Sequence, residues 1–305
     1  MLLSLLIPCH NEAGNIPLLV HRVAEGLRDT EYEIIFIDDG SSDDTLTVIK
    51  KTAENDSRIK FIQLSRNFGH QAALKAGIDH ARGNCIVTMD ADLQHPPEKI
   101  PDMIALWQQG YDVVNARRNG NGERGIIKRI TASVYYKLLD KLTDENIPEG
   151  VADFRLFDRK VADVIRALPE RDLYLRGLFA WAGFRQTTIT YNEEERKHGN
   201  TKYNLWRMLR LAGNGITSFS TKPLKLSLTI GVMFAFIAFA YGIYAIAMLI
   251  AGHTVTGWTS VIASILFLSG IQLIVLGILG EYLGKLFMEN KRRPVYIVKE
   301  TNLDG

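Results

Sequence analysis

The chain has little cysteine, little net charge and a long stretch with no charge at all. Its two cysteines, Cys9 and Cys85, stand in apolar surroundings, which excludes a disulfide framework and favours a reducing compartment. With 36 basic and 34 acidic residues the net charge is +2, so no nucleic-acid partner is expected. The first residues are apolar but lack a basic leader and a small-residue cleavage site, which favours a first strand over a signal peptide.

The missing charges are concentrated between Lys225 and Glu281, where no Asp, Glu, Lys or Arg occurs. This range holds two hydrophobic segments, 226–251 and 258–280, each long enough to cross the hydrocarbon core as a helix. Basic residues flank both outer ends and none lies in the connecting loop, so the positive-inside rule predicts cytoplasmic flanks. A hairpin buried inside a soluble protein is the alternative.

Short β-type runs alternate with helical patterns in the first part of the chain. This alternation predicts an α/β domain with a mostly parallel sheet, in which ligands bind at the carboxyl ends of the strands. The predicted strands are 2–7, 33–38, 59–64, 85–90 and 111–116, and the predicted helices are 16–27, 43–53, 71–81 and 97–109.

Four regions follow from these patterns. Apolar residues interleave with Lys202, Arg207 and Arg210 just before the hydrophobic pair, which predicts an amphipathic helix at the bilayer surface. A core helix of the globular domain is the alternative there. We divide the chain into a cytoplasmic globular domain, 1–200, a juxtamembrane amphipathic segment, 201–225, two transmembrane helices within 226–280, and a cytoplasmic tail, 281–305.

Asp90, Asp92 and Gln94 end the fourth apolar run with alternating oxygen-bearing side chains. In extended backbone, positions i, i+2 and i+4 share one face, so these side chains are expected to point the same way. Carboxylate and amide oxygens suit Mg²⁺ or Mn²⁺, with positions left for a substrate's phosphates. A solvated strand end is the alternative. The scattered histidines lack paired zinc-ligand spacing and are interpreted as polar lining or surface residues: His10, His70, His95 and His198.

Polar clusters also follow the first and second predicted strands. Pro8 ends the first strand before Asn11 and Glu12, and Asp38 and Asp39 close the second. The acidic pair can accept hydrogen bonds from a base or a ribose, whereas Asp43 fits a helix N-cap as well as a ligand contact. Together with the acidic motif of the fourth strand, these clusters are expected to converge on one crevice.

The order of the motifs carries a resemblance that covers essentially the whole chain. The motifs are Pro8-x-x-Asn11-Glu12, Asp38-Asp39-Gly40-Ser41, Asn67-Phe68-Gly69, Asp90-Ala91-Asp92-Leu93-Gln94, Asp153-Phe154-Arg155 and the run from Arg196 to Tyr203. With the hydrophobic pair, the chain resembles family 2 glycosyltransferases. More narrowly, it is similar to the polyprenyl-phosphate group, which includes bacterial undecaprenyl-phosphate glucosyltransferases and dolichol-phosphate mannose synthases.

The resemblance implies a GT-A fold, the nucleotide-diphospho-sugar transferase architecture, followed by interfacial helices and a transmembrane hairpin. It implies a contact of Asp39 with the nucleotide base and a metal, Mg²⁺ or Mn²⁺, held by Asp90, Asp92 and Gln94. The metal would neutralise charge that develops on the nucleotide leaving group. The nucleotide-sugar candidates are Pro8, Asn11, Glu12, Asp38, Asp39 and Asp90.

The acceptor in such enzymes is a lipid phosphate, which carries about 1.5 to 2 negative charges. It needs positive charge and in-line orientation more than a general base. Similar enzymes place an Arg and a Ser four residues apart against this phosphate. The acceptor candidates are Arg117, Arg129, Ser133, Arg196 and Lys202, of which Arg196 and Lys202 also fit a general attraction to anionic lipid.

The catalytic candidates are Asp153, Arg155 and Arg117. Asp153 matches the position that the resemblance suggests as catalytic. We expect Asp153 to orient the sugar or the acceptor, with Arg155 supporting its loop. Direct attack by the acceptor, without a covalent enzyme intermediate, should invert the anomeric centre.

The expected reaction moves one sugar, glucose first, from a UDP-sugar to undecaprenyl phosphate at the bacterial inner membrane. N-acetylglucosamine, galactose and 4-amino-4-deoxyarabinose stay open as the sugar. By the resemblance, a separate flippase and a downstream glycosyltransferase would use the product to modify a surface polymer. The hairpin also allows a homo-oligomer.

Three other functions compete with this interpretation. The run 120–125 formally fits G-x-G-x-x-G, but its acidic partners fall in a helical pattern, which argues against an NAD(P)-binding oxidoreductase. A processive polysaccharide synthase would need more membrane helices and a Gln-x-x-Arg-Trp motif. A membrane scaffold without activity leaves the metal and nucleotide clusters unexplained.

Overall fold

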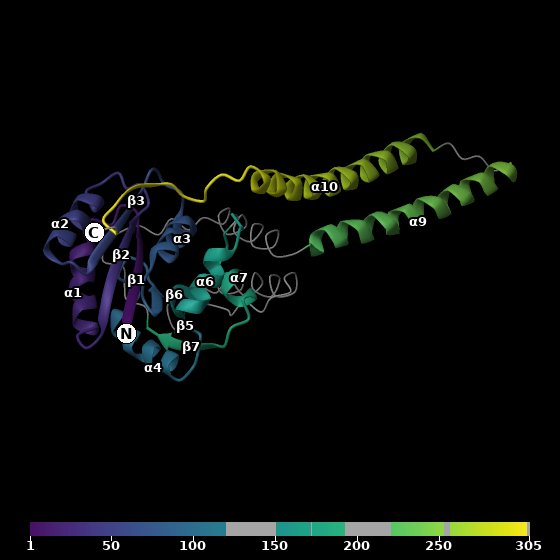
Figure 1. The fold of residues 1–305 in the computed structure, drawn as a ribbon. Helices are drawn as coiled ribbons and strands as arrows, with labels where there is room; N and C mark the ends of the chain where they lie inside the picture. Colours follow the sequence, from purple (N-terminus) through teal and green to yellow (C-terminus); the bar gives the residue numbers. More distant parts are fainter. Residues whose placement is uncertain (120–150, 172, 193–220, 253–256, 304–305) are drawn as a thin grey trace. The chain divides into compact units, whose positions relative to one another are not determined.

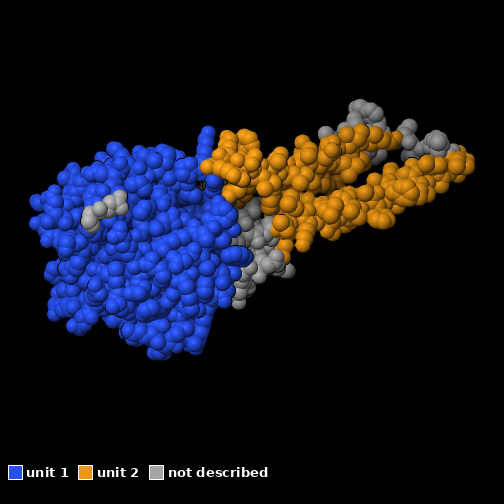
Figure 2. Space-filling view, viewed as in Figure 1, with its two compact units in different colours: residues 1–136, 145–205, 293–305 blue, residues 137–144, 206–292 orange. Residues whose placement is uncertain are grey.

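A computed structural model of the chain describes residues 1–119, 151–171, 173–192, 221–252 and 257–303 (Figure 1). These residues fall into two compact units, shown in different colours in Figure 2. Of the described residues, unit 1 contains 1–119, 151–171, 173–192 and 293–303, and unit 2 contains 221–252 and 257–292. Several predictions lie outside the described residues: the 120–125 loop, the amphipathic segment, Arg129, Ser133, Arg196, His198 and Lys202.

Unit 1 is built on an eight-stranded mixed sheet with the order β7-β5-β6-β4-β1-β2-β3-β8. Its centre, β4-β1-β2-β3, is parallel, while β6 runs antiparallel between β4 and β5. The prediction of a mostly parallel sheet is therefore confirmed. The strands are β1 Leu2–Cys9, β2 Glu31–Asp38, β3 Ile59–Leu64, β4 Cys85–Thr88, β5 Val113–Arg118, β6 Val151–Asp158, β7 Gln186–Tyr191 and β8 Val298–Thr301.

Helices cover both faces of this sheet, as Figure 1 shows. Because β1 is buried on both faces, its sequence is apolar except for the buried Ser4 and does not alternate. Leu3, Leu5 and Ile7 join the core formed with helices α1, α2 and α4. These helices span Ile16–Gly26, Thr45–Asn55 and Ile100–Gln108, the last preceded by a 3-10 turn, η1, at Pro97–Lys99.

The other face carries α3, His70–His80, which packs closely on the sheet. A Cβ atom on Gly77 would lie 2.9 Å from Ile37 Cδ1 and 3.2 Å from Leu6 Cδ1, so the glycine permits this close approach. Next to α3 lies α6, Arg159–Ala167, and α7, Leu175–Trp181, contacts α6. Because α3 follows β3, its first turn lies at the carboxyl ends of the parallel strands.

The last residues of unit 1 form a C-terminal strap, residues 293–303, that the hydrophobic patterns did not predict. Its strand β8 pairs antiparallel with β3. Lys50 Nζ lies 2.6 Å from Glu300 Oε1, and Tyr296 Oη donates a 2.9 Å hydrogen bond to Asp79 Oδ2 on α3. This region was expected as a tail, but its residues complete one edge of the sheet.

Unit 2 contains two long apolar helices, α9 Lys222–Ile250 and α10 Trp258–Asn290. Lys222–Met248 and Ala263–Asn290 have mean hydropathies of 2.1 and 2.2, and both are long enough to cross a membrane. Phe236, Phe239 and Leu273 are 69% to 72% exposed. A hairpin buried in a globular core does not fit these exposures. The ring centroids of Phe234 on α9 and Phe267 on α10 lie 5.8 Å apart, so the two helices contact each other there.

Candidate active site

The polar clusters of β1, β2 and β4 follow strands that run parallel side by side. They therefore meet at one edge of the sheet, as expected. Asn11 and Glu12 follow β1, Asp39 follows β2, and Asp90 and Asp92 follow β4.

Asp39 anchors the loop that leaves β3. Its Oδ1 accepts a 2.7 Å hydrogen bond from the Phe68 backbone N–H, and its Oδ2 accepts a 2.9 Å bond from the Gly69 N–H. Burial raises the pKa of the Asp39 carboxyl, although these two N–H groups oppose the increase. The side chain is thus committed to the Asn67-Phe68-Gly69 loop, and its contact with a nucleotide base stays a prediction.

The loop after β1 is tied to the loop after β2 by hydrogen bonds of Asn11. Asn11 has a φ of 60°, its backbone N–H donates to Ser41 Oγ at 3.0 Å, and its Oδ1 accepts from the Ser42 N–H at 2.8 Å. The Glu12 N–H donates to Thr45 Oγ1 at 2.8 Å, at the start of α2. Asn11 therefore ties the two loops together through its backbone and its side chain, and Glu12 contributes through its backbone N–H.

The remaining candidates differ in burial, since Pro8 and Asp38 lie buried at the ends of their strands and Asp43 is exposed. Asp38 is 1% exposed and accepts a hydrogen bond from the Ser41 N–H at 3.2 Å, and Pro8 is buried in β1 opposite Ile37. Asp43 Oδ1 accepts from the Thr45 N–H at 3.0 Å, where α2 begins. The N-cap of α2 is Asp44, so the prediction of Asp43 as the N-cap is wrong by one residue, and Asp43 instead holds the turn that precedes the helix.

The acidic motif after β4 does not have the expected backbone. The prediction of extended backbone over residues 90–94 is wrong. The strand β4 ends at Thr88, residues 91 and 92 lie in a turn, and Leu93 has a φ of 64°. The Gln94 N–H donates to Asp92 Oδ1 at 3.2 Å within this turn. The i, i+2, i+4 argument therefore does not apply to Asp90, Asp92 and Gln94.

The donor set of this turn still suits a hard divalent cation, because it offers carboxylate and amide oxygens. Asp90 keeps 32% of its side chain exposed, whereas Asp92 is 8% exposed. Within the described ranges, no three His, Cys, Asp or Glu residues form a ready-made metal cluster. A cation here would take its remaining ligands from substrate oxygens and water.

His95 closes the turn from inside the core. It is fully buried, stacks on Phe154 at 5.1 Å and meets the edge of Tyr191 at 5.8 Å. Its Nδ1 lies 3.0 Å from the Asp90 backbone N, which makes Nδ1 the acceptor and leaves the ring proton on Nε2. Burial lowers the pKa of His95, so the ring stays neutral. Its interpretation as a lining or surface residue is therefore wrong.

Asp153 on β6 faces a cluster of cationic groups. Arg176 Nε and Nη2 each donate to its carboxylate at 2.8 Å, and His70 Nε2 lies 3.4 Å from Oδ2. Burial would raise the pKa of Asp153, but Arg176 and the hydrogen bond from His70 hold it well below its usual range. A carboxylate held in this form is a poor proton acceptor, which agrees with an orienting role.

Arg155 and Arg117 occupy different surroundings. Arg155 is 3% exposed, lies over the Phe179 ring at 4.4 Å and approaches Asp153 Oδ1 to 3.9 Å. Burial lowers its pKa to about 10, so it is charged at neutral pH. Arg117 is exposed on β5, in register with Val151 of β6.

Two site residues escaped the sequence argument. His70 was noted only among scattered histidines, yet its Nε2 lies 3.6 Å from Asp90 Oδ1 and links the acidic turn to Asp153. Arg176 lies in the first turn of a short helix, α7, that no pattern predicted. The Asn67-Phe68-Gly69 motif was the one available signal for His70, which directly follows it.

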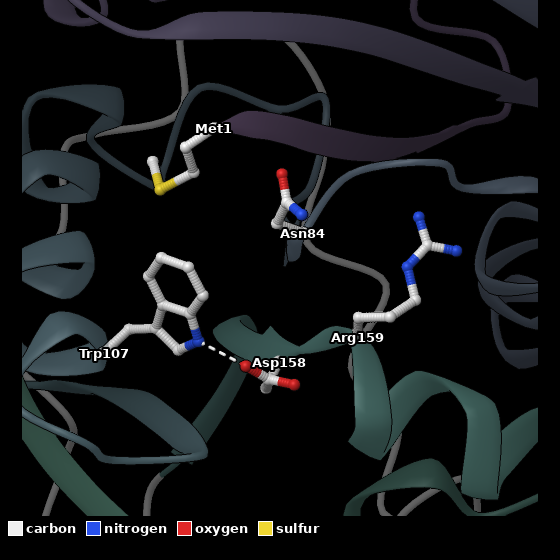
Figure 3. A pocket seen from close by; sticks show the side chains of 5 residues that line it. All are labelled: Met1, Asn84, Trp107, Asp158 and Arg159. Carbon is white, nitrogen blue, oxygen red and sulfur yellow. Dashed lines mark hydrogen bonds between the residues drawn. The ribbon is translucent and has the colours of Figure 1, made fainter.

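A hollow of about 580 Å³ lies at the opposite edge of the sheet (Figure 3). Met1 and Asn84 stand at the amino ends of β1 and β4 and line it with Trp107, Asp158 and Arg159. Trp107 Nε1 donates to Asp158 Oδ2 at 2.7 Å, and Arg159 Nε donates to the Gly83 carbonyl at 2.9 Å. This hollow lies at the opposite ends of the parallel strands from Asp39, Asp90 and Asp92.

A doubly wound sheet that carries acidic clusters after β2 and β4 defines a nucleotide-sugar transferase domain of the GT-A type. Residues 4–166 match the family model "Glycosyl transferase family 2", and residues 222–286 match "GtrB C-terminal hairpin". The chain belongs to glycosyltransferase family 2 and is a glycosyltransferase.

Relatives match over the whole length of the chain. The bactoprenol glucosyl transferase of Shigella phage SfV is 44% identical over 98% of this chain and 98% of its own. The prophage bactoprenol glucosyl transferase homolog of Escherichia coli K12 is 44% identical over 98% of this chain and 99% of its own. Among solved structures, the mannosyltransferase PcManGT from Pyrobaculum calidifontis, in complex with GDP-Man and Mn²⁺, has a TM-score of 0.51 at 17% identity. The superposition covers 95% of this chain and 86% of the mannosyltransferase chain, and this similarity concerns the fold alone.

Proposed function

We propose that the protein transfers glucose from UDP-glucose to undecaprenyl phosphate, with inversion and with help from Mg²⁺ or Mn²⁺. The observation that carries this proposal is the 43% to 44% identity to named bactoprenol glucosyl transferases over 98% to 99% of the chain. That similarity extends through the apolar helix pair, where a lipid substrate would be met. A processive synthase is less well supported, since its channel would need further membrane helices.

The donor half of the site is assigned to the turn after β4. Asp90 and Asp92, with Gln94, would hold the cation, whose charge would stabilise the nucleotide diphosphate as it leaves. His95 fixes the backbone of Asp90 from inside the core. Asp39 fixes the loop at Phe68 and Gly69, and Asn11 and Glu12 shape the neighbouring wall.

The acceptor half needs positive charge and no general base. A lipid phosphate is already ionised and can attack the anomeric carbon directly, opposite the departing diphosphate. The low pKa of Asp153 supports this scheme, because such a carboxylate would take up a proton poorly at neutral pH. Arg117, Arg129, Ser133, Arg196 and Lys202 remain the proposed acceptor contacts.

The proposed membrane topology places both flanks of the helix pair in the cytoplasm. The chain leaves unit 1 before α9 and returns to it as the C-terminal strap after α10. Both ends of the pair are thus bound to one domain, which supports an even number of crossings. Lys222, Lys225 and the basic run 291–293 flank the pair and favour the cytoplasmic side.

The proposed setting is the bacterial inner membrane, with domain 1–200 and the tail 281–305 in the cytoplasm. A separate flippase and a downstream glycosyltransferase would then use the lipid-linked sugar to modify a surface polymer. A homo-oligomer through the hairpin belongs to the same proposal.

The test uses membranes that contain the full-length protein, undecaprenyl phosphate and radiolabelled UDP-glucose, UDP-N-acetylglucosamine or UDP-galactose. We expect label from UDP-glucose in the lipid fraction, with a β-linkage, and its loss in EDTA with recovery on adding Mn²⁺ or Mg²⁺. Asp92→Asn should lose this recovery, whereas Asp102→Asn, which alters an exposed carboxylate paired with Lys99 on the protein surface, should keep it. No labelled lipid from any donor would refute the function, and an α-linked product would refute the single-displacement mechanism.

A further inference from the structure

The Asp153 carboxylate is outnumbered by the cationic side chains that contact it. One carboxylate faces the guanidinium groups of Arg155 and Arg176, both within 4 Å of its oxygens. Asp153, Arg155 and Arg176 therefore sum to one positive charge, and His70 contacts both this group and the Asp90 carboxylate. A site built to hold a general base would not surround its carboxylate with cations, because they stabilise the ionised form.

The two arginines differ in how far they reach solvent. Arg155 is enclosed beneath Asp153, where it lies over the Phe179 ring. Arg176 keeps 33% of its side chain exposed while it makes the two-bond fork to Asp153. Arg155 thereby compensates the carboxylate from inside the protein, and Arg176 presents the positive charge outward.

The position of Arg176 is fixed next to the acidic turn. The Leu175 N–H at the start of α7 donates to Gln71 Oε1 at 3.0 Å, which ties α7 to the first turn of α3. In the same turn of α3, His70 Nε2 bridges Asp153 at 3.4 Å and Asp90 at 3.6 Å. His70 therefore connects the carboxylate that holds this guanidinium with the carboxylate assigned to the donor's cation.

We propose that Arg176, oriented by Asp153, binds a phosphate oxygen of the lipid acceptor during sugar transfer. A guanidinium whose orientation is fixed by a bidentate carboxylate is well suited to a second planar or tetrahedral anion. The donor diphosphate is assigned to the cation, so Arg176 would add a guanidinium beside Asp153 to the acceptor contacts already proposed. Asp153 is then a positioning residue, and Arg176 contacts the substrate. This inference rests on the proposed function.

The experiment compares Arg176→Gln, Arg176→Lys, Asp153→Asn and the double variant Asp153→Asn/Arg176→Gln in the full-length protein. The KM for undecaprenyl phosphate is measured at saturating UDP-glucose, and the Kd for UDP-glucose is measured separately by calorimetry. A matched control is the Asp56–Arg58 pair, which makes the same fork, with Nε–Oδ1 3.0 Å and Nη2–Oδ2 2.7 Å, before β3 at the other edge of the sheet.

Arg176→Gln should raise the acceptor KM about 10- to 100-fold, the range for loss of a charge-assisted hydrogen bond, with the donor Kd within about twofold of wild type. Arg176→Lys should give a smaller rise, because it keeps the charge and loses the fork. Asp153→Asn should raise the same KM without shifting the pH profile of kcat. The double variant should have an acceptor KM no higher than that of Arg176→Gln, because both changes remove the same Asp153–Arg176 pair. Asp56→Asn and Arg58→Gln should leave the acceptor KM unchanged.

An unchanged acceptor KM in both Arg176 variants would overturn the inference. Weaker binding of UDP-glucose with an unchanged acceptor KM would also overturn it, because Arg176 would then contact a phosphate of the donor. Loss of kcat in Asp153→Asn with normal kinetics in Arg176→Gln would make Asp153 itself the acting group. Normal binding of UDP-glucose shows that a variant is folded. If Arg176→Gln does not fold, the acceptor KM of Arg176→Lys tests the inference in its place. Failure of the wild-type protein to form a lipid-linked sugar would instead refute the proposed function.

Discussion

Replacement of His95 by phenylalanine should separate the stability of the fold from the affinity of the cation site. The phenyl ring keeps the stacking on Phe154 and the edge contact with Tyr191. It removes Nδ1, which accepts the Asp90 backbone N–H at 3.0 Å. It also removes the Nε2–H group, for which the described part of the chain offers no acceptor.

The two losses oppose each other in the free energy of unfolding. A buried donor without a partner costs about 1 to 3 kcal/mol, so removing Nε2–H stabilises the fold by about that amount. The Asp90 N–H left behind costs a similar amount or less, because Asp90 is only partly buried. The net change should stay within about 1 kcal/mol, or roughly 2 to 4 °C in Tm for a domain of this size.

The cation site has no such compensation. Without its anchor the turn is free to move Asp90, and we expect the Mn²⁺ concentration for half-maximal transfer to rise about tenfold, equivalent to about 1.4 kcal/mol. The assay is thermal unfolding together with sugar transfer over a Mn²⁺ titration. His21→Phe, at a side chain that is 69% exposed on α1, is the matched control. Normal Mn²⁺ activation in His95→Phe would refute the anchoring role, and a large drop in Tm would refute the compensation.

Three further outcomes test the fold around the site. Gly40→Ala should destabilise the protein much more than Gly183→Ala. Both glycines have positive φ, which costs about 1 to 2 kcal/mol for alanine. A Cβ atom on Gly40 would lie 2.6 Å from backbone atoms, whereas a Cβ atom on Gly183 would have no atom nearer than 3.9 Å. Chemical denaturation measures both, and equal losses would contradict the close approach. Tyr296→Phe removes the hydrogen bond to Asp79 and should lower the unfolding free energy by about 1 kcal/mol; no loss would mean that this bond does not help to hold the strap. Burial, assisted by a nearby carboxylate, raises the pKa of Cys85 to about 12, so a maleimide should label it at pH 8 only after denaturation; rapid labelling of the native protein would contradict its burial.

The central sheet was predictable because its strands are buried on both faces. Runs such as Leu2–Cys9 and Glu31–Asp38 are apolar over most of their length, and each is followed by a polar loop. The strands β6, β7 and β8 escaped prediction. β7 is only partly buried, and β8 is a four-residue edge strand whose partner lies far away in the sequence.

The site was predictable in its residue types and less so in its geometry. The chemistry of Asp90 and Asp92 could be inferred from their side chains, but the left-handed backbone at Leu93 could not, because a leucine gives no sign of positive φ. Arg176 could not be linked to Asp153 because the pair depends on how α7 packs. The burial of His95 likewise depends on Phe154 and Tyr191, which come from two other strands.

The C-terminal strap also sets an order for the making of the protein. Thr301 and Phe61 are hydrogen-bonded although 240 positions separate them, so β8 reaches the ribosome exit only after both apolar helices have been synthesised. Until then β3 is an open strand edge, with N–H and C=O groups that can pair with another chain. Closing so long a loop is slow compared with local folding. The glycosyltransferase domain therefore completes its sheet last, and a nascent chain stalled at the apolar helices would carry an unprotected edge.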